Sequence, residues 1–214
     1  MAKEKILPLE KVMRLIEFDN ELCSGALCGV DEAGRGPLAG PVSVCACVMP
    51  REIPIIGVDD SKKLSETKRE ALYDSIVAVA DYCVVLIDRK TIDEINILQA
   101  TKLGMKRAVE GLKAKPDRVA VDAVKDIDID VPYDSIIKGD AKSYNIAAAS
   151  IIAKVMRDRF MRELDRQYPA YGFAKNKGYG TREHIAALKA CGPCPEHRRT
   201  FIGHFVDVSE TAGG

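Results

Sequence analysis

The sequence predicts one α/β domain built around a mixed five-stranded sheet. Short apolar runs rich in β-branched residues alternate with longer segments of helical periodicity, which is the pattern of a sheet covered by helices. A Gly/Pro-rich link between the first two apolar runs suits an antiparallel hairpin, whereas helices separate later runs. No internal repeat, low-complexity tract or linker interrupts the 214 residues, so we expect a single domain over residues 1–214.

A short helix and a hairpin open the chain. Residues 8–18 place apolar side chains at helical spacing after Pro8, which suits a first helical position. This helix belongs to an expected N-terminal helical extension over residues 1–25. Residues 26–32 and 41–49 are rich in small and β-branched apolar residues, and we expect them to pair as antiparallel strands.

The middle of the chain predicts two helices around a third strand. Ser65 is a candidate N-cap for a helix that continues to about residue 79. Residues 82–88 are apolar and predict the strand, and residues 91–112 show a mostly helical period. We expect Lys115-Pro116 to end this second helix, because proline does not continue a helix.

Two further predicted strands each end in an aspartate. Residues 118–122 form a short apolar strand that ends at Asp122, and residues 135–140 form another that ends at Asp140. These two segments complete the five strands of the expected sheet.

Helices dominate the C-terminal part. A long helix is expected from Ser143 to about residue 167, and its first half is apolar nearly all round and therefore buried. Residues 169–180 are predicted to be loop-like, and a last short helix follows over residues 181–189 with Thr181 as its N-cap. We expect residues 206–214 to form a flexible tail.

Composition and charge are typical of a folded, soluble, cytoplasmic protein, and a monomer is the default expectation. No segment approaches the roughly 18 apolar residues of a membrane span, and charges interrupt the N-terminus too often for a signal peptide. The odd number of cysteines, 7, and the position of Cys28, Cys45 and Cys47 in strand-like runs indicate buried thiols in a reducing compartment. The formal net charge is zero, but residues 1–134 contain 19 basic and 24 acidic side chains and the remainder 13 and 8, so the second half is basic.

Four carboxylates lie at or just after the ends of predicted strands, namely Asp31, Glu32, Asp122 and Asp140. Ligands of α/β sheets gather beyond the carboxyl ends of strands, so acids from three strands can converge there. A cluster of like charges is unfavourable unless a cation neutralises it, and Mg²⁺ and Mn²⁺ prefer oxygen ligands. Two such ions about 3.5–4 Å apart would activate a water for attack on a phosphodiester. The alternative for any one acid is a solvated loop charge.

A Gly-Arg-Gly turn, Gly34-Arg35-Gly36, follows the first acidic pair. Glycines let backbone N–H groups approach a ligand oxygen closely, and a site of this kind could recognise a ribose 2′-hydroxyl. The alternative is that Arg35 is an ordinary turn residue.

Seven motifs resemble those of the bacterial ribonuclease HII family. They occur in that family's order from about residue 26 to residue 205, so the resemblance covers most of the chain. The motifs are VDEAGRGP at 30–37, DSKKL at 60–64, VDA at 121–123, KGDAKS at 138–143, AAASIIAKVMRDR at 147–159, KGYGT at 177–181 and PEHR at 195–198.

The resemblance implies a ribonuclease H-like fold, which agrees with the mixed sheet predicted above. It implies hydrolysis of RNA in RNA/DNA hybrids and cleavage 5′ to ribonucleotides embedded in duplex DNA, leaving a 3′-hydroxyl and a 5′-phosphate. It further implies two bound divalent ions, Mg²⁺ or Mn²⁺. The residues implied to be catalytic and to bind these ions are Asp31, Glu32, Asp122 and Asp140.

The resemblance also implies which residues contact the substrate. The Gly-Arg-Gly turn would sense the 2′-hydroxyl, and Tyr179 would pack on the sugar at the RNA–DNA junction. Four more residues belong to motifs that lie near the nucleic-acid backbone, namely Ser61, Lys62, Lys142 and Ser143.

Basic residues of the second half form two groups. Those of the long helix alternate with acids and are expected on a solvated face, with Asp158 as an ion-pair partner rather than a metal ligand; they are Lys154, Arg157, Arg159, Arg162 and Arg166. Those of the C-terminal part have few acids between them and predict a phosphate-contacting surface; they are Lys175, Lys177, Arg182, Lys189, Arg198 and Arg199.

Other functions remain open at this point. The Cys191-Gly192-Pro193-Cys194 segment also occurs in thioredoxin-like oxidoreductases, but here it follows a helix instead of opening one. A zinc half-site would require His197 and His204 as further ligands, and His184 and His197 fit a structural role equally well. A non-catalytic nucleic-acid-binding module would leave the strand-end acids unexplained. A ribonuclease HIII-like enzyme is the alternative within the same class, although such enzymes usually have an extra N-terminal domain.

Overall fold

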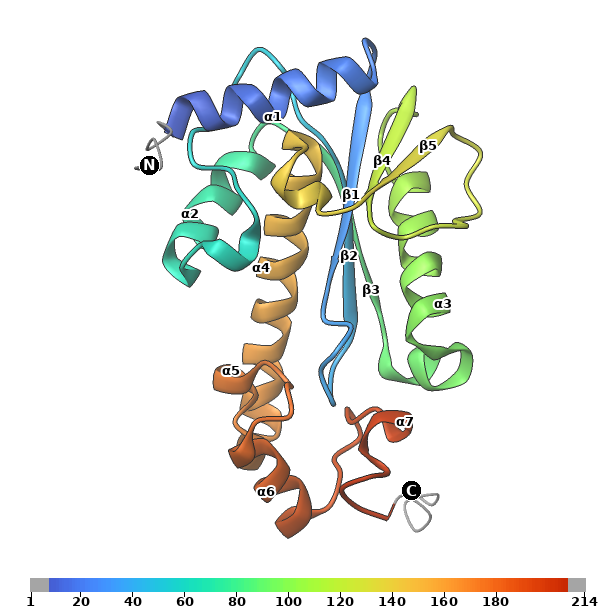
Figure 1. Ribbon diagram of the computed structural model, residues 1–214. Helices are drawn as coiled ribbons and strands as arrows, with labels where there is room; N and C mark the ends of the chain where they lie inside the picture. The colour runs from blue at the N-terminus through green and yellow to red at the C-terminus, as the bar shows by residue number, and fades with distance from the viewer. Residues whose placement is uncertain (1–7, 208–214) are drawn as a thin grey trace, which may run out of the picture.

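A mixed five-stranded sheet forms the centre of the molecule, as the sequence predicts (Figure 1). The computed structural model describes residues 8–207. The strand order is β3-β2-β1-β4-β5, in which β1 pairs antiparallel with β2 and parallel with β4. The strands are β1 (Leu27–Ala33), β2 (Val42–Val48), β3 (Asp81–Ile87), β4 (Arg118–Asp122) and β5 (Tyr133–Ile136).

Helices cover both faces of this sheet (Figure 1). Helices α1, α2 and α4 pack on one face and α3 packs on the other. The α-helices are α1 (Pro8–Leu22), α2 (Glu66–Val77), α3 (Arg89–Glu110), α4 (Tyr144–Gln167), α5 (Phe173–Asn176), α6 (Arg182–Cys191) and α7 (Arg199–Ile202). The C-terminal part is helical, in agreement with the prediction.

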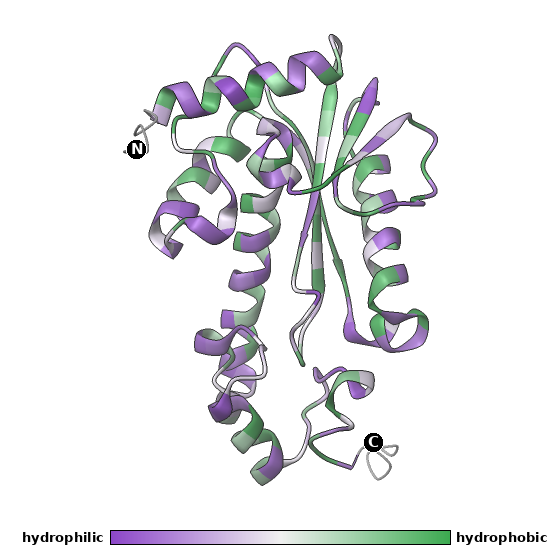
Figure 2. Cartoon of the chain, viewed as in Figure 1, coloured by the Kyte–Doolittle hydropathy of each residue, from purple (hydrophilic) through white to green (hydrophobic). Residues whose placement is uncertain are grey.

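Strand β2 is buried on both faces because both are covered by helices. Its Cys45 and Cys47 face the α4 side of the sheet, and Val44 and Ala46 face α3. Alternate residues of a strand point to opposite faces, so a strand between two helical layers is apolar at consecutive positions. Figure 2 shows the resulting white and green colour along the central strands. The burial of Cys28, Cys45 and Cys47 confirms the prediction of buried thiols.

Several predicted boundaries are wrong. Strand β5 ends at Ile136, and Asp140 lies in a 3-10 turn (Gly139–Ala141) rather than at a strand end. Helix α3 ends before Gly111, not at Lys115-Pro116, and bends at Asn96, where φ is 65°. The segment predicted to be a loop contains the 3-10 turn Pro169–Tyr171 and helix α5, and the sequence did not predict α7.

Helix α1, the described part of the expected N-terminal extension, packs against the first half of α4. Val12, Leu15 and Ile16 belong to the same buried cluster as the first half of α4. Asp19 is 1% exposed, and its Oδ2 accepts hydrogen bonds from the backbone N–H of Asn145 at 2.9 Å and from its side-chain amide at 2.7 Å. Helix α1 therefore stabilises the start of α4. Residues 1–7 of the expected extension and 208–214 of the expected tail lie outside the described residues.

Replacing Asp19 with Ala should destabilise the fold. The change removes two buried hydrogen bonds and leaves donors of Asn145 unpaired near the N-terminus of α4. We expect a loss of about 2–4 kcal/mol in the free energy of unfolding, measured by denaturant titration. Asp19→Asn keeps an acceptor oxygen and is the matched control, with a smaller expected loss. An Asp19→Ala variant as stable as the parent would contradict this role.

The α-helices of residues 8–207 are α1 to α7. None of them is both long enough and apolar enough to cross a bilayer.

Candidate active site

Strands β1 and β4 bring two of the acidic residues side by side. The parallel ladder between these strands ends at the pair Val30 and Val121. The next residues are Asp31 and Asp122, so adjacent strands present their carboxylates at the same edge of the sheet. Asp31 is only 4% exposed.

Asp140 reaches this place from the 3-10 turn after β5. The Gly139 N–H donates a hydrogen bond to Asp122 Oδ1 at 2.7 Å, which holds the turn against the end of β4. One carboxylate oxygen from each of Asp31, Asp122 and Asp140 lies within 4.8 Å of the others. We call these three residues the acidic cluster.

Glu32 lies beside the acidic cluster and fits a metal site. Its Oε1 is 3.4 Å from Nη1 of Arg35. Its Oε2 is buried and has no hydrogen-bond partner within residues 8–207. A buried carboxylate oxygen without a partner is unfavourable, and a cation bound by the neighbouring carboxylates would supply one.

Electrostatics at the cluster point the same way. Burial raises the pKa of Asp31 well above its ordinary value, and the charges of Glu32 and Asp122 raise it further. Burial also raises the pKa of Glu32 and of Asp140. Lys62 Nζ lies 3.5 Å from Asp140 Oδ2; burial opposes its charged form, yet the charges of Asp31 and Asp140 raise its pKa. A divalent cation would favour the ionised form of all these carboxyl groups.

A cavity of about 220 Å³ is lined by Asp31 and by most of the predicted substrate-binding residues. Tyr179 is 44% exposed and lines it from the C-terminal part of the chain. We call this cavity the site pocket. Its lining residues are Asp31, Glu32, Ala33, Gly34, Arg35, Gly36, Ser61, Lys62, Lys154 and Tyr179.

Two of the predicted substrate-binding residues lie outside this lining. Lys142 is exposed next to the 3-10 turn that contains Asp140. Ser143 is fully buried, and its side chain caps α4 by accepting a hydrogen bond from the Ile146 N–H at 3.2 Å. The structure therefore supports a capping role for Ser143 and leaves it no exposed surface.

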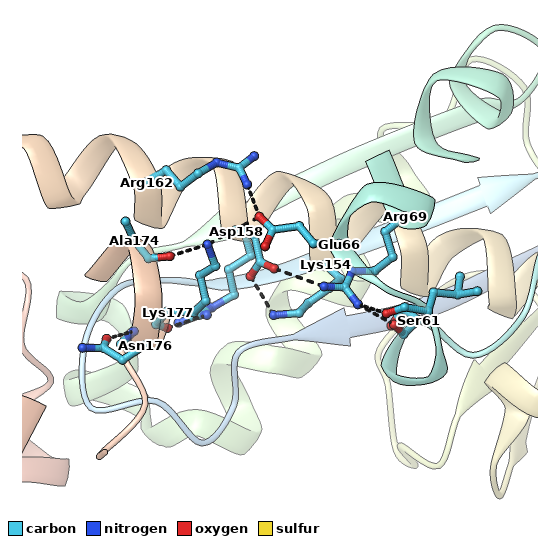
Figure 3. Close-up of polar contacts among 12 residues, drawn as sticks. Ser61, Glu66, Arg69, Lys154, Asp158, Arg162, Ala174, Asn176 and Lys177 are labelled. Carbon is cyan, nitrogen blue, oxygen red and sulfur yellow. Dashed lines mark hydrogen bonds and ion pairs between the residues drawn. The ribbon is translucent and has the colours of Figure 1, made fainter. Parts of the chain in front are cut away.

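Lys154 was expected on a solvated helix face, but it lines the site pocket. Its ammonium group lies 2.6 Å from Asp158, which is 2% exposed and also lies 3.9 Å from Arg69 (Figure 3). Arg69 in turn donates to the Ser61 carbonyl at 2.9 Å. Asp158 is thus an ion-pair partner, as predicted. The signal in the sequence for Lys154 was its position in the family motif at 147–159, whereas helical periodicity could not show that distant segments form a pocket around it.

Two arginines lie inside the protein instead of on its surface. Arg157 was expected on the solvated face of the long helix and Arg198 on the phosphate-contacting surface, but both side chains are fully buried. Both predictions are wrong, because each guanidinium finds its hydrogen-bond partners in backbone carbonyls of the loop after β1. Arg159 and Arg162 do lie at the surface, paired with Glu70.

His184 and His197 form a buried structural pair. The Cys194 N–H donates to His197 Nδ1 at 3.0 Å, so His197 carries its proton on Nε2 and donates it to His184 Nε2 at 3.0 Å. His184 then donates from Nδ1 to the Tyr179 carbonyl at 2.9 Å. Both rings must be neutral for this chain of hydrogen bonds to exist.

The histidine pair predicts a loss of stability in acid. Burial, followed by the charge of His184, lowers the pKa of His197 to about 4 from an unfolded value near 6.5. The unfolded chain therefore binds the extra proton first, and stability falls as pH drops from about 6.5 to about 4, by on the order of 3 kcal/mol. Denaturant titrations across this range should show a shallower pH dependence in His197→Asn. Exposed His204→Gln is the control with unchanged slope; an unchanged slope in His197→Asn would contradict the assignment.

The Cys191 and Cys194 pair lacks the features of a redox site. Cys191 is the last residue of α6, whereas the reactive first thiol of a Cys-x-x-Cys oxidoreductase lies at a helix N-terminus. A zinc site is also not formed, because His197 Nδ1 and Nε2 are both engaged in hydrogen bonds.

The fold and the site pocket together define a class of protein. A mixed sheet in the order β3-β2-β1-β4-β5, with carboxylates converging from β1, β4 and the turn after β5, is the arrangement of a metal-dependent hydrolytic nuclease with a ribonuclease H-like fold.

Comparisons with known proteins specify the family. The family model for ribonuclease HII matches residues 28–206. Ribonuclease HII of Acetivibrio thermocellus is 55% identical over 181 residues, 84% of this chain and 71% of that protein. Ribonuclease HII of Desulfitobacterium hafniense strain Y51 is 51% identical over 201 residues, 92% of this chain and 77% of that protein. The crystal structure of ribonuclease H2 from Pyrococcus horikoshii OT3 has a TM-score of 0.68 and 32% identity, covering 81% of this chain and 92% of that one.

The chain belongs to the ribonuclease HII family. It is a ribonuclease H-type endonuclease, a metal-dependent hydrolase of phosphodiester bonds. A solved RNase HIII from Bst, with a TM-score of 0.69 but 21% identity, shares the fold alone.

Proposed function

We propose that the protein hydrolyses the RNA strand of RNA/DNA hybrids and cuts 5′ to ribonucleotides embedded in duplex DNA, leaving 3′-hydroxyl and 5′-phosphate ends. The observation that supports this most strongly is that Asp31 of the acidic cluster and its neighbour Glu32 line the same site pocket as the Gly-Arg-Gly turn. The cluster is suited to cations at a phosphodiester, and the turn offers backbone groups to a ribose.

We assign the metal-binding role to Asp31, Glu32, Asp122 and Asp140, with Mg²⁺ or Mn²⁺ as the ions because the donors are all carboxylate oxygens. Two such ions, when bound, supply activation of a water and stabilisation of the leaving oxygen. Among these carboxylates, Glu32 contributes a buried oxygen, Oε2, that has no hydrogen-bond partner within residues 8–207.

The other residues of the site bind and orient the substrate in this proposal. The Gly-Arg-Gly turn contacts the 2′-hydroxyl, and the half-exposed ring of Tyr179 packs against the sugar. Lys62, which lines the pocket and lies 3.5 Å from Asp140, contacts the backbone phosphate with its ammonium group. Ser61 lines the pocket beside Lys62, and exposed Lys142 contacts the nucleic-acid backbone. Ser143 caps helix α4, which follows the turn that contains Asp140.

A monomer in the cytoplasm is the state in which we propose the enzyme acts. Size-exclusion chromatography with light scattering would test the monomer, and a stable dimer would contradict it.

A cleavage assay on a duplex with one embedded ribonucleotide tests the proposed function. Each strand is labelled in turn, and the reaction contains Mg²⁺ or Mn²⁺. We expect a single cut on the 5′ side of the ribonucleotide. We expect no cut in the all-DNA duplex and none when EDTA removes the metal ions. A folded preparation that makes no product with either ion, or that cuts on the 3′ side, would contradict the proposal.

A further inference from the structure

Two fully buried arginines bind the loop that contains the Gly-Arg-Gly turn. Arg157 lies in α4 and Arg198 lies just before α7, and both side chains are 0% exposed. Within residues 8–207, neither guanidinium is within ion-pair distance of a carboxylate, and their hydrogen bonds go to backbone carbonyls. Burying a charge without a counter-charge is unfavourable, so an apolar side chain would serve simple packing better.

Arg198 holds the turn itself. Its Nη2 donates to the Gly34 carbonyl at 2.7 Å, its Nη1 to the Arg35 carbonyl at 2.9 Å and its Nε to the Gly40 carbonyl at 2.9 Å. One guanidinium thereby fixes two successive peptide groups of the turn and the far end of the loop. The planar, forked donor geometry of arginine makes this possible, and the single ammonium group of lysine cannot reproduce it.

Arg157 supports the same loop from α4. It donates to the carbonyls of Pro41 at 3.0 Å, Ala39 at 3.2 Å and Lys177 at 2.9 Å. Gly34 has φ +97°, and a Cβ at this position would lie 1.9 Å from Nε of Arg157. The Arg157 side chain therefore occupies the space that a side chain at position 34 would need, and only glycine fits there.

The direction of the carbonyls decides the direction of the N–H groups. In a planar trans peptide the C=O and the following N–H point in opposite directions, and residues 8–207 contain no cis peptide. Since the carbonyls of Gly34 and Arg35 point inward to Arg198, the N–H groups of Arg35 and Gly36 point away from it. Arg35 and Gly36 line the site pocket.

We propose that Arg157 and Arg198 are positioning residues that turn the loop carbonyls inward and so present the N–H groups of the Gly-Arg-Gly turn to the substrate ribose. The inference rests on the proposed function, because the ribose is the ligand assigned to the turn. It extends that function to two residues that touch no substrate. It also gives the C-terminal segment a part in recognition, since Arg198 and the Lys177 carbonyl both come from it.

The test compares affinities for two duplexes of the same sequence, one with a single ribonucleotide and one all-deoxy. All proteins contain Asp122→Asn to prevent cleavage, and binding is measured by fluorescence anisotropy in Mg²⁺. Arg198→Met and Arg198→Lys should lose at least about tenfold of the preference for the ribonucleotide, because backbone donors no longer face the 2′-hydroxyl, while affinity for the all-deoxy duplex changes little. Arg157→Lys should show the same loss.

Exposed Arg166, in the same helix as Arg157, provides the matched control, since Arg166→Met should keep the full preference. Circular dichroism checks that each variant is folded, and the Lys variants keep the charge if the Met variants do not fold. A folded Arg198→Lys and a folded Arg157→Lys that both retain the preference within twofold would overturn the inference. A parent protein that itself shows no preference would instead overturn the proposed role of the turn.

Discussion

Asp122→Asn should reduce the cleavage rate by at least about a thousandfold. The substitution removes one negative charge from the acidic cluster, in which oxygens of Asp31, Asp122 and Asp140 lie within 4.8 Å. The asparagine oxygen can still accept the hydrogen bond from the Gly139 N–H, now 2.7 Å long, so the turn that contains Asp140 should stay in place. The loss should therefore arise from weaker cation binding and not from unfolding.

Single-turnover cleavage of the ribonucleotide-containing duplex measures this effect, and Mn²⁺ titration calorimetry measures the weakened metal binding. Asp128→Asn is the matched control, because the Asp128 side chain is 91% exposed and lies in the segment that follows Asp122 between β4 and β5. The control should keep parental activity. Cleavage by Asp122→Asn within tenfold of the parent would contradict the assignment of Asp122, and duplex binding should persist in both variants.

Gly29→Ala should destabilise the protein by about 3 kcal/mol or more, a fall of roughly 10 °C in Tm. Gly29 lies in β1, where the N-terminal turn of α4 crosses it. A Cβ at this position would lie 2.1 Å from the Asn145 carbonyl carbon and 2.2 Å from the Ile146 nitrogen. Because these are backbone atoms, the whole end of α4 would have to move.

Thermal unfolding followed by circular dichroism measures the change. Gly203→Ala is the control, since no atom of residues 8–207 lies within 4 Å of a Cβ at position 203, and its Tm should be unchanged within about 2 °C. Equal Tm values for Gly29→Ala and the parent would show that α4 can shift at no cost. Such a shift would also move the 3-10 turn that precedes α4 and with it Asp140, so residual activity of the folded variant reports on the cluster.

Local patterns predicted most elements of the fold. The alternation of apolar runs and helical segments predicted the five strands, and the predicted caps Ser65 and Thr181 are found at the starts of α2 and α6. These features depend on side chains within a few residues of one another, which is why periodicity and capping chemistry detect them. Boundaries were less accurate, as the end of α3 at Gly111 shows, because several local stop signals compete there.

The sequence by itself determined the family motifs and the identity of the acidic residues, because strand-end carboxylates and glycine-rich turns are local features. Only the tertiary structure decided that Asp140 approaches from a turn and that Lys154 lines the pocket. It also decided that Arg157 and Arg198 are buried. The physical reason is that an arginine in a charged segment has the same sequence pattern whether its partners are water or carbonyls. These carbonyls belong to a loop more than 100 residues away in the sequence.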